Sequence, residues 1–264
     1  MSGERDFVEA LARGLDVITA FSTSRLEMTV SDVALATGLA RPTARRLLLT
    51  LETLGYVRSV DGMFSLTPKV LELGTAYIDA QGMWDIARPH LRALVEQTRE
   101  SSSMSQLDGS DIVYTARVPV PKIIGLSVQI GTRFPATATS MGQVLLADLP
   151  EPELDQALRT ASQSNVVPRV KLTRRELDTV LAEVRKRGWA LSDEQLALGV
   201  RSIAAPVRDA SGRTVAAVNV TVHAAETSIS DLRKRHLPKL LTTAAAITDD
   251  FVSLGTLPST KPMR

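Results

Sequence analysis

The sequence has 264 residues, and its 31 lysines and arginines against 29 aspartates and glutamates give a formal net charge of +2. It contains no cysteine, which excludes disulfides, thiol nucleophiles, cysteine-ligated zinc and iron–sulfur clusters. No apolar run approaches the roughly 18–20 residues of a membrane span, and residues 1–6 are polar, unlike a signal peptide. We therefore expect a cytoplasmic protein without a membrane partner, and a charge so near zero does not by itself indicate nucleic acid.

The first third of the chain is expected to form three helices and a β-hairpin. Gly38 breaks the second helix, and Pro42 suits the start of the third, because a missing N–H costs nothing there. Asp61-Gly62 separates two β-prone runs, which is a strong hairpin signal. The pattern predicts helices over 7–22, 29–37 and 42–54, strands over 56–60 and 63–66, and a connecting helix over 68–80.

The remainder mixes helices and strands in an order that indicates an α+β domain around an antiparallel sheet. Helices are predicted over 86–98, 140–147, 151–161, 173–188 and 230–253, and strands over 103–107, 112–118, 123–130, 202–208 and 214–223. The tail, 256–264, contains two prolines and is expected to be disordered.

Helix, glycine turn, helix and hairpin in this order indicate a winged helix-turn-helix, which places its second helix in the major groove of DNA. Residues 41–69 carry five basic and two acidic residues, although residues 1–80 carry eight basic and ten acidic ones. Positive charge is thus concentrated where this geometry would place DNA. The alternative is that Arg45 and Arg46 only form a solvent-exposed charged face of the helix and do not contact DNA.

Several segments resemble the IclR family of bacterial transcriptional regulators. On the DNA side they are TVSDVA at 29–34, TGL at 37–39, TARRLL at 43–48 and LGYV at 54–57. Further along they are GTRFPATATSMG at 131–142, GWALSDEQ at 188–195 and GVRSIAAP at 199–206. The sequence of residues 44–51 resembles that of the branch that regulates β-ketoadipate pathway genes for aromatic acids, the PcaR, PcaU and PobR group.

The resemblance implies a winged helix-turn-helix over 1–66, a linker helix used for dimerisation over 67–82, and a GAF-like effector-binding domain over 83–255. It also implies a homodimer or tetramer on palindromic double-stranded operator DNA. The expected DNA-contacting residues are Ser31, Arg41, Pro42, Thr43, Arg45, Arg46, Arg58 and Lys69.

Arg117, Arg133 and Arg201 lie in apolar or small-residue stretches, which suggests partly buried cations that need a partner. That partner is either Asp193 or Glu194, or the carboxylate of an effector. The resemblance places the effector pocket at 137–142, 193–194, 204–205 and 219–221. The expected effector-binding residues are Arg117, Arg133, Thr139, Met141, Gly142, Asp193, Glu194, Arg201, Ala205, Asn219 and Thr221.

The sequence argues against an enzyme. Its three histidines, His90, His223 and His236, have no metal-ligand spacing, and it has no nucleophile elbow or phosphate-binding loop. We expect no cofactor and no metal. The prediction is a regulator that responds to β-ketoadipate, protocatechuate or 4-hydroxybenzoate. The alternatives are an IclR-type regulator of another carboxylate-catabolism operon, a hydrolase activity within 83–255, and a DNA-binding structural protein without a ligand.

Overall fold

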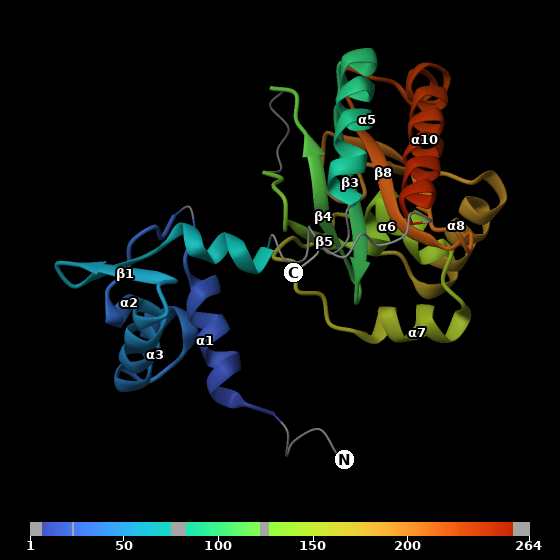
Figure 1. Ribbon diagram of the computed structural model, residues 1–264. Coiled ribbons are helices and arrows are strands. Elements are labelled where there is room, and N and C mark those ends of the chain that lie inside the picture. The colour runs from blue at the N-terminus through green and yellow to red at the C-terminus, as the bar shows by residue number, and fades with distance from the viewer. Residues whose placement is uncertain (1–6, 23, 75–82, 122–126, 256–264) are drawn as a thin grey trace. The chain divides into compact units, whose positions relative to one another are not determined.

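The computed structural model describes residues 7–22, 24–74, 83–121 and 127–255. The chain divides into two compact units, residues 1–80 and 81–264, which are described separately (Figure 1). The last part of the predicted linker helix, 75–82, and the predicted tail, 256–264, lie outside the described residues. Within the described residues, no helix is both long enough and apolar enough to cross a membrane.

The N-terminal unit is a three-helix cluster followed by a two-stranded hairpin, which confirms the predicted winged helix-turn-helix fold. Its elements are α1 (Glu9–Ala20), α2 (Val30–Thr37), α3 (Arg41–Thr53), β1 (Val57–Val60) and β2 (Met63–Leu66). The strands pair antiparallel. Val17, Val33, Leu48 and Phe64 belong to one shared core, so each helix and the hairpin contribute to it.

Local chemistry fixes the turns of this unit. The Thr29 side chain accepts a hydrogen bond from the Asp32 backbone N–H while the Asp32 carboxylate accepts one from the Thr29 N–H, so α2 begins with a capping box. α2 ends at Gly38, whose φ of +69° suits glycine. α3 begins at Arg41, one residue earlier than predicted, with Pro42 in its first turn. After the hairpin, residues 68–70 form a short 3-10 helix, η1 (Pro68–Val70), in place of the predicted α-helical start.

The C-terminal unit is built on a six-stranded sheet in the order β5-β4-β3-β8-β7-β6, in which every neighbouring pair is antiparallel. The strands are β3 (Ser101–Asp108), β4 (Asp111–Val118), β5 (Arg133–Pro135), β6 (Ala190–Asp193), β7 (Val200–Arg208) and β8 (Thr214–His223). The predicted α+β class is confirmed. The strand predicted over 123–130 is wrong for 127–130, which has no strand, and 123–126 lies outside the described residues.

Helices cover both faces of this sheet. One face packs α5 (Met83–Thr98) and the closing helix α10 (Leu237–Gly255), which run side by side in Figure 1. The other face packs η2 (Ala136–Ala138), α6 (Ser140–Ala147), α7 (Glu151–Arg159) and α8 (Arg174–Arg187). The predicted helix over 230–253 is divided: α9 (Ile229–Asp231) leads into a π-helical turn, η3 (Leu232–His236), before α10.

Candidate DNA-reading helix and ligand pocket

α3 has one buried face and one cationic face. Ala44, Leu48 and Leu51 are buried against the rest of the N-terminal unit. Arg45 and Arg46 are exposed on the other side. Because neither guanidinium makes a hydrogen bond or ion pair with any described residue, both are free to bind an external anion such as a DNA phosphate or a guanine edge.

The other predicted DNA contacts fall into two groups. Ser31, Arg41 and Pro42 are exposed and Thr43 is half-buried in the first turns of α2 and α3. In the hairpin, exposed Arg58 donates from Nε to Ser65 Oγ across the strands at 3.1 Å.

Lys69 is engaged within the fold. Its Nζ donates to the Leu54 carbonyl at 3.0 Å and lies 5.2 Å from the Tyr56 ring centroid. A cation at a free carbonyl of a helix C-terminus stabilises the helix, so Lys69 caps α3.

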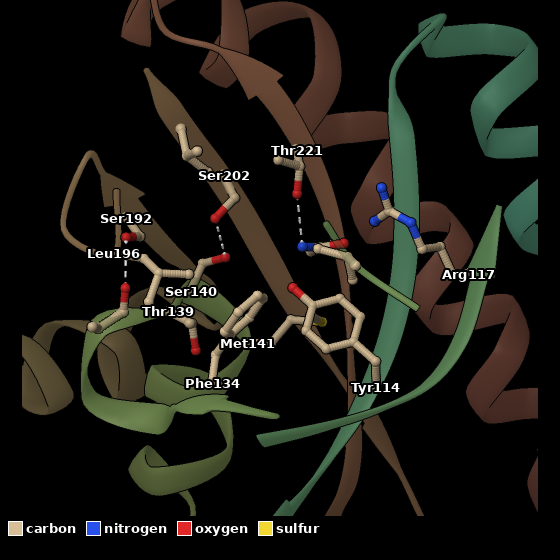
Figure 2. Close-up of a pocket in the computed structure, with 14 residues that line it drawn as sticks. Tyr114, Arg117, Phe134, Thr139, Ser140, Met141, Ser192, Leu196, Ser202 and Thr221 are labelled. Carbon is tan, nitrogen blue, oxygen red and sulfur yellow. Dashed lines mark hydrogen bonds between the residues drawn. The ribbon is translucent and has the colours of Figure 1, made fainter. Parts of the chain in front are cut away.

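The C-terminal unit contains a pocket on the sheet face that carries α6, with about 540 Å³ of empty space, a volume that includes open solvent. Its walls come from β4, β7 and β8, from the segment that joins η2 to α6, and from the neighbourhood of β6 (Figure 2). Apolar and polar side chains both line it: Tyr114, Arg117, Val128, Phe134, Ala138, Thr139, Ser140, Met141, Ser192, Leu196, Val200, Ser202, Asn219 and Thr221.

A β-bulge brings Tyr114 and Arg117 into this pocket together. Successive side chains of a strand alternate between faces, so residues three apart point to opposite sides. Here Met104 pairs with Ala116 and Ser105 with Tyr114, so Thr115 is one extra residue on β4. Tyr114 accordingly belongs to the core on one face and Ala116 to the core on the other. The extra residue reverses the alternation, and Arg117 returns to the face of Tyr114.

Arg117 is a half-buried cation without an acidic partner among the residues that the structure describes. Its Nη1 donates to Ser103 Oγ at 3.1 Å, and no described carboxylate lies within ion-pair distance of it. Burial lowers the pKa of Arg117 from its ordinary value, yet a guanidinium stays charged in proteins. A partly buried charge is costly unless it is paired, so this wall of the pocket favours an anionic ligand.

Tyr114 places a neutral hydroxyl beside that cation. Its ring meets Phe134 edge to face, with centroids 5.6 Å apart and an interplanar angle of 87°. Only 7% of the residue is exposed, and its hydroxyl has no hydrogen-bond partner among the described residues. Burial raises the pKa of Tyr114 to about 12, so the phenol remains a hydrogen-bond donor at neutral pH.

Hydroxyl groups and an amide complete the lining (Figure 2). The Ser140 and Ser202 hydroxyls share a hydrogen bond of 2.7 Å. Asn219 Oδ1 accepts from the Ser103 backbone N–H at 3.0 Å, and its Nδ2 donates to Thr221 Oγ1 at 2.9 Å. Because Thr221 Oγ1 and the serine hydroxyls keep unused lone pairs, the pocket can receive hydrogen bonds from a ligand as well as donate them.

The structure places five of the residues predicted to bind effector in this lining: Arg117, Thr139, Met141, Asn219 and Thr221. Two other predicted arginines are paired elsewhere. Arg133 lies 2.8 Å from Asp108 and 3.5 Å from Asp111. Arg201 Nε lies 2.6 Å from Asp193 Oδ1, and its Nη1 donates to two backbone carbonyls.

The remaining three predicted residues have structural partners. Glu194 accepts from the Gly199 N–H at 2.6 Å. Gly142 packs against the backbone of Ala136, where an added Cβ would lie 2.1 Å from the carbonyl oxygen. Ala205 is fully buried in the core on the opposite face of the sheet. None of these three, nor Arg133, Asp193 or Arg201, is among the lining residues.

Sequence reasoning missed the aromatic wall and the serines. Tyr114 and Phe134 are two of the few aromatic residues in a chain that has only 4% of them, which is a weak signal for a ring-binding site. Ser192 and Ser202 are isolated hydroxyls within apolar strands. Such residues are more often satisfied internally, and only the fold brings them to one pocket.

Family models match both units. A model of the IclR helix-turn-helix domain matches residues 10–61, and a model of the bacterial transcriptional regulator IclR C-terminal domain matches residues 75–249. The two matches together span most of the chain.

Individual relatives match over 62% to 94% of this chain. The Pca regulon regulatory protein of Pseudomonas putida is 39% identical over 91% of this chain and 83% of its own length. A solved structure of a transcriptional regulator from Rhodococcus sp. RHA1 is 48% identical, with a TM-score of 0.82, over 94% of this chain and all of that one. A solved double mutant of the Acinetobacter PobR inducer-binding domain, in complex with 3-hydroxybenzoic acid, is 31% identical, with a TM-score of 0.55. It covers 62% of this chain and 96% of that one.

Proposed function

This chain belongs to the IclR family of bacterial transcriptional regulators, which are not enzymes, and we propose that its pocket senses a small aromatic hydroxy acid and so controls genes for the breakdown of such acids. The observation that carries the proposal is Arg117, a half-buried cation that lines the pocket without an acidic partner among the described residues. The relatives named for the Pca regulon and for PobR support the aromatic class.

The chemistry of the lining matches such a ligand part by part. A carboxylate accepts two parallel hydrogen bonds from the planar guanidinium of Arg117. An aromatic ring packs between Phe134 and Met141, where apolar burial and edge-to-face contact stabilise it. A ring hydroxyl exchanges hydrogen bonds with Ser140 and Ser202.

A dicarboxylate such as β-ketoadipate fits the lining less well. Among the described lining residues Arg117 is the single charged one, so a second carboxylate would be buried among hydroxyls without a cation to pair with it. An unpaired buried charge is penalised far more than a buried hydroxyl that finds a partner. The pocket therefore favours a monocarboxylate that carries a hydroxyl, such as 4-hydroxybenzoate.

The test is whether ligand changes DNA binding by the whole chain. Anisotropy of a labelled fragment of the regulated promoter would be measured with 4-hydroxybenzoate, protocatechuate, β-ketoadipate or benzyl alcohol. We expect the first two to change operator affinity and the neutral alcohol to leave it unchanged. An equal response to all four, or to none, would contradict the proposal.

We also propose that the operator is double-stranded DNA read by α3 from a homodimer or tetramer in the cytoplasm. Arg45 and Arg46 supply cations for the groove, and a closed two-fold assembly presents two such helices to two half-sites. The N-terminal unit also exposes an apolar face along α1. Leu11 is 64% exposed and Leu15 48% exposed, and contiguous exposed apolar surface marks an association site.

A further inference from the structure

A second group of cations lies at the edge of the six-stranded sheet, and none of them is among the pocket-lining residues. β6 is the terminal strand, and Trp189 directly precedes it. α8, whose core contacts lie on one face of the sheet, ends in Arg185, Lys186 and Arg187. η3, whose buried Leu232 packs on the other face, carries Arg233, Lys234 and Arg235. Among the described residues, none of these six cations forms an ion pair.

The indole of Trp189 joins the two layers. The guanidinium carbon of Arg187 lies 4.1 Å from the ring centroid, and that of Arg233 lies 5.7 Å from it. Arg187 Nε also donates to the Trp189 carbonyl at 2.6 Å. Trp189 and Arg187 are half-buried and Arg233 is exposed, so one guanidinium is held against the ring and a second lies near it before any partner arrives.

The two arginines repel each other in this position. Burial, and after it the charge of Arg233, lowers the pKa of Arg187, while the charge of Glu183 opposes the shift. An external anion that contacted both guanidiniums would relieve this repulsion, and Arg187 would lose little side-chain freedom because its stacked geometry already exists.

We propose that Arg187, Trp189 and Arg233, which we call the edge clamp, are the centre of a docking surface for an acidic segment of a partner protein. A guanidinium fork matches a carboxylate in shape and donates two hydrogen bonds to it. The indole adds apolar contact beside the charge. Tryptophan and arginine are the residue types that most often dominate binding energy at protein interfaces.

A peptide explains this surface better than a nucleic acid does. Duplex DNA presents phosphates at regular intervals and is bound by cations spread along its backbone. In the edge clamp two cations converge on one ring, which suits a single compact anion with apolar chain on either side. The flanking Lys186, Lys234 and Arg235 are exposed and supply positive charge for further acidic residues.

The experiment uses the full chain and a fluorescein-labelled octaglutamate peptide, with anisotropy as the measure of binding. The sequence has two tryptophans, so Trp84→Phe leaves Trp189 as the sole indole and its emission reports whether the peptide reaches the edge clamp. We expect saturable binding that weakens with salt, together with a change in Trp189 emission.

Arg187→Gln/Arg233→Gln should weaken peptide binding by roughly tenfold, because both guanidiniums of the clamp are lost. The control, Arg159→Gln/Arg175→Gln, removes the same charge from exposed positions on α7 and α8 and should retain most of the affinity. Equal losses in the two double variants, with unchanged thermal unfolding, would overturn the proposal. So would a loss of affinity for a 20-base-pair duplex that lacks the operator in Arg187→Gln/Arg233→Gln but not in the control variant, because the edge clamp would then be a nucleic-acid contact.

Discussion

At the scale of single residues, the pocket depends on two side chains with different electrostatic roles. Arg117 supplies a permanent charge that burial makes costly and a ligand carboxylate would neutralise. Tyr114 supplies a hydroxyl that stays neutral because burial raises its pKa to about 12. One group therefore selects for an anion, and the other adds a directed hydrogen bond.

Tyr114→Phe should weaken binding of 4-hydroxybenzoate by about 1 kcal/mol, roughly fivefold, because one hydrogen bond is lost while the ring contact with Phe134 remains. Calorimetric titration measures the change. The loss should be the same at pH 6 and pH 9, since the phenol is protonated throughout this interval. Unchanged affinity would show that the hydroxyl does not contact the ligand.

Arg46→Gln tests the cationic face of α3. If the guanidinium reads a base, operator binding should weaken by about 1–3 kcal/mol, and if it binds phosphate, the slope of log affinity against log salt should fall by about one. Arg45→Gln should behave in the same way. Filter binding over a salt series distinguishes the two cases, and no change in affinity or slope would exclude a contact.

Lys69→Met tests whether Lys69 stabilises the end of α3, in contrast to Arg45 and Arg46, which we expect to contact DNA. Its ammonium holds the Leu54 carbonyl at 3.0 Å, so the substitution should lower the stability of the N-terminal unit by about 0.5–1 kcal/mol through loss of the helix-end cation. Thermal unfolding followed by circular dichroism measures this. A variant that loses operator affinity at full stability would make Lys69 a DNA contact instead.

At the scale of elements, close packing of α6 fixes the floor of the pocket. An added Cβ at Gly142 would lie 2.1 Å from the Ala136 carbonyl oxygen. Gly142→Ala should therefore destabilise the C-terminal unit by about 1–3 kcal/mol through overpacking. Gly14→Ala in α1, where nothing lies within 4 Å, should stabilise by about 0.5–1 kcal/mol. Urea unfolding measures both variants, and equal effects would contradict the packing argument.

The sequence alone does not predict the β-bulge in β4. Thr115 has no turn-forming chemistry, and alternation along β4 would place Tyr114 and Arg117 on opposite faces. The extra residue becomes visible only through the pairing of β4 with β3. For the same reason β5, with three residues, and β6, with four, were not predicted. Strands this short are defined by their neighbours and carry no periodic pattern of their own.

At the scale of the whole molecule, the sequence predicts those features that depend on interactions between residues near one another in the chain. Gly38, Pro42 and the Asp61-Gly62 turn set the ends of the helices and the hairpin, so the winged unit followed from helix-end and turn chemistry. The site in the C-terminal unit followed less well. Sequence reasoning grouped Arg117 with Arg133 and Arg201 and named Asp193 as one partner, but only the fold shows which arginine lacks a carboxylate partner among the described residues. Arg133 forms ion pairs with Asp108 and Asp111, and Arg201 forms one with Asp193.

The most direct test of the account is a calorimetric comparison of 4-hydroxybenzoate with 4-hydroxybenzamide on the wild-type chain and on Arg117→Met. We expect the wild-type protein to bind the acid at least tenfold more tightly than the neutral amide, since a hydrogen bond to a charged group contributes about 1.5–3 kcal/mol. We also expect Arg117→Met to remove most of that preference while thermal unfolding is unchanged. A wild-type protein that bound the two compounds equally, or a variant that kept the full preference for the acid, would contradict the account.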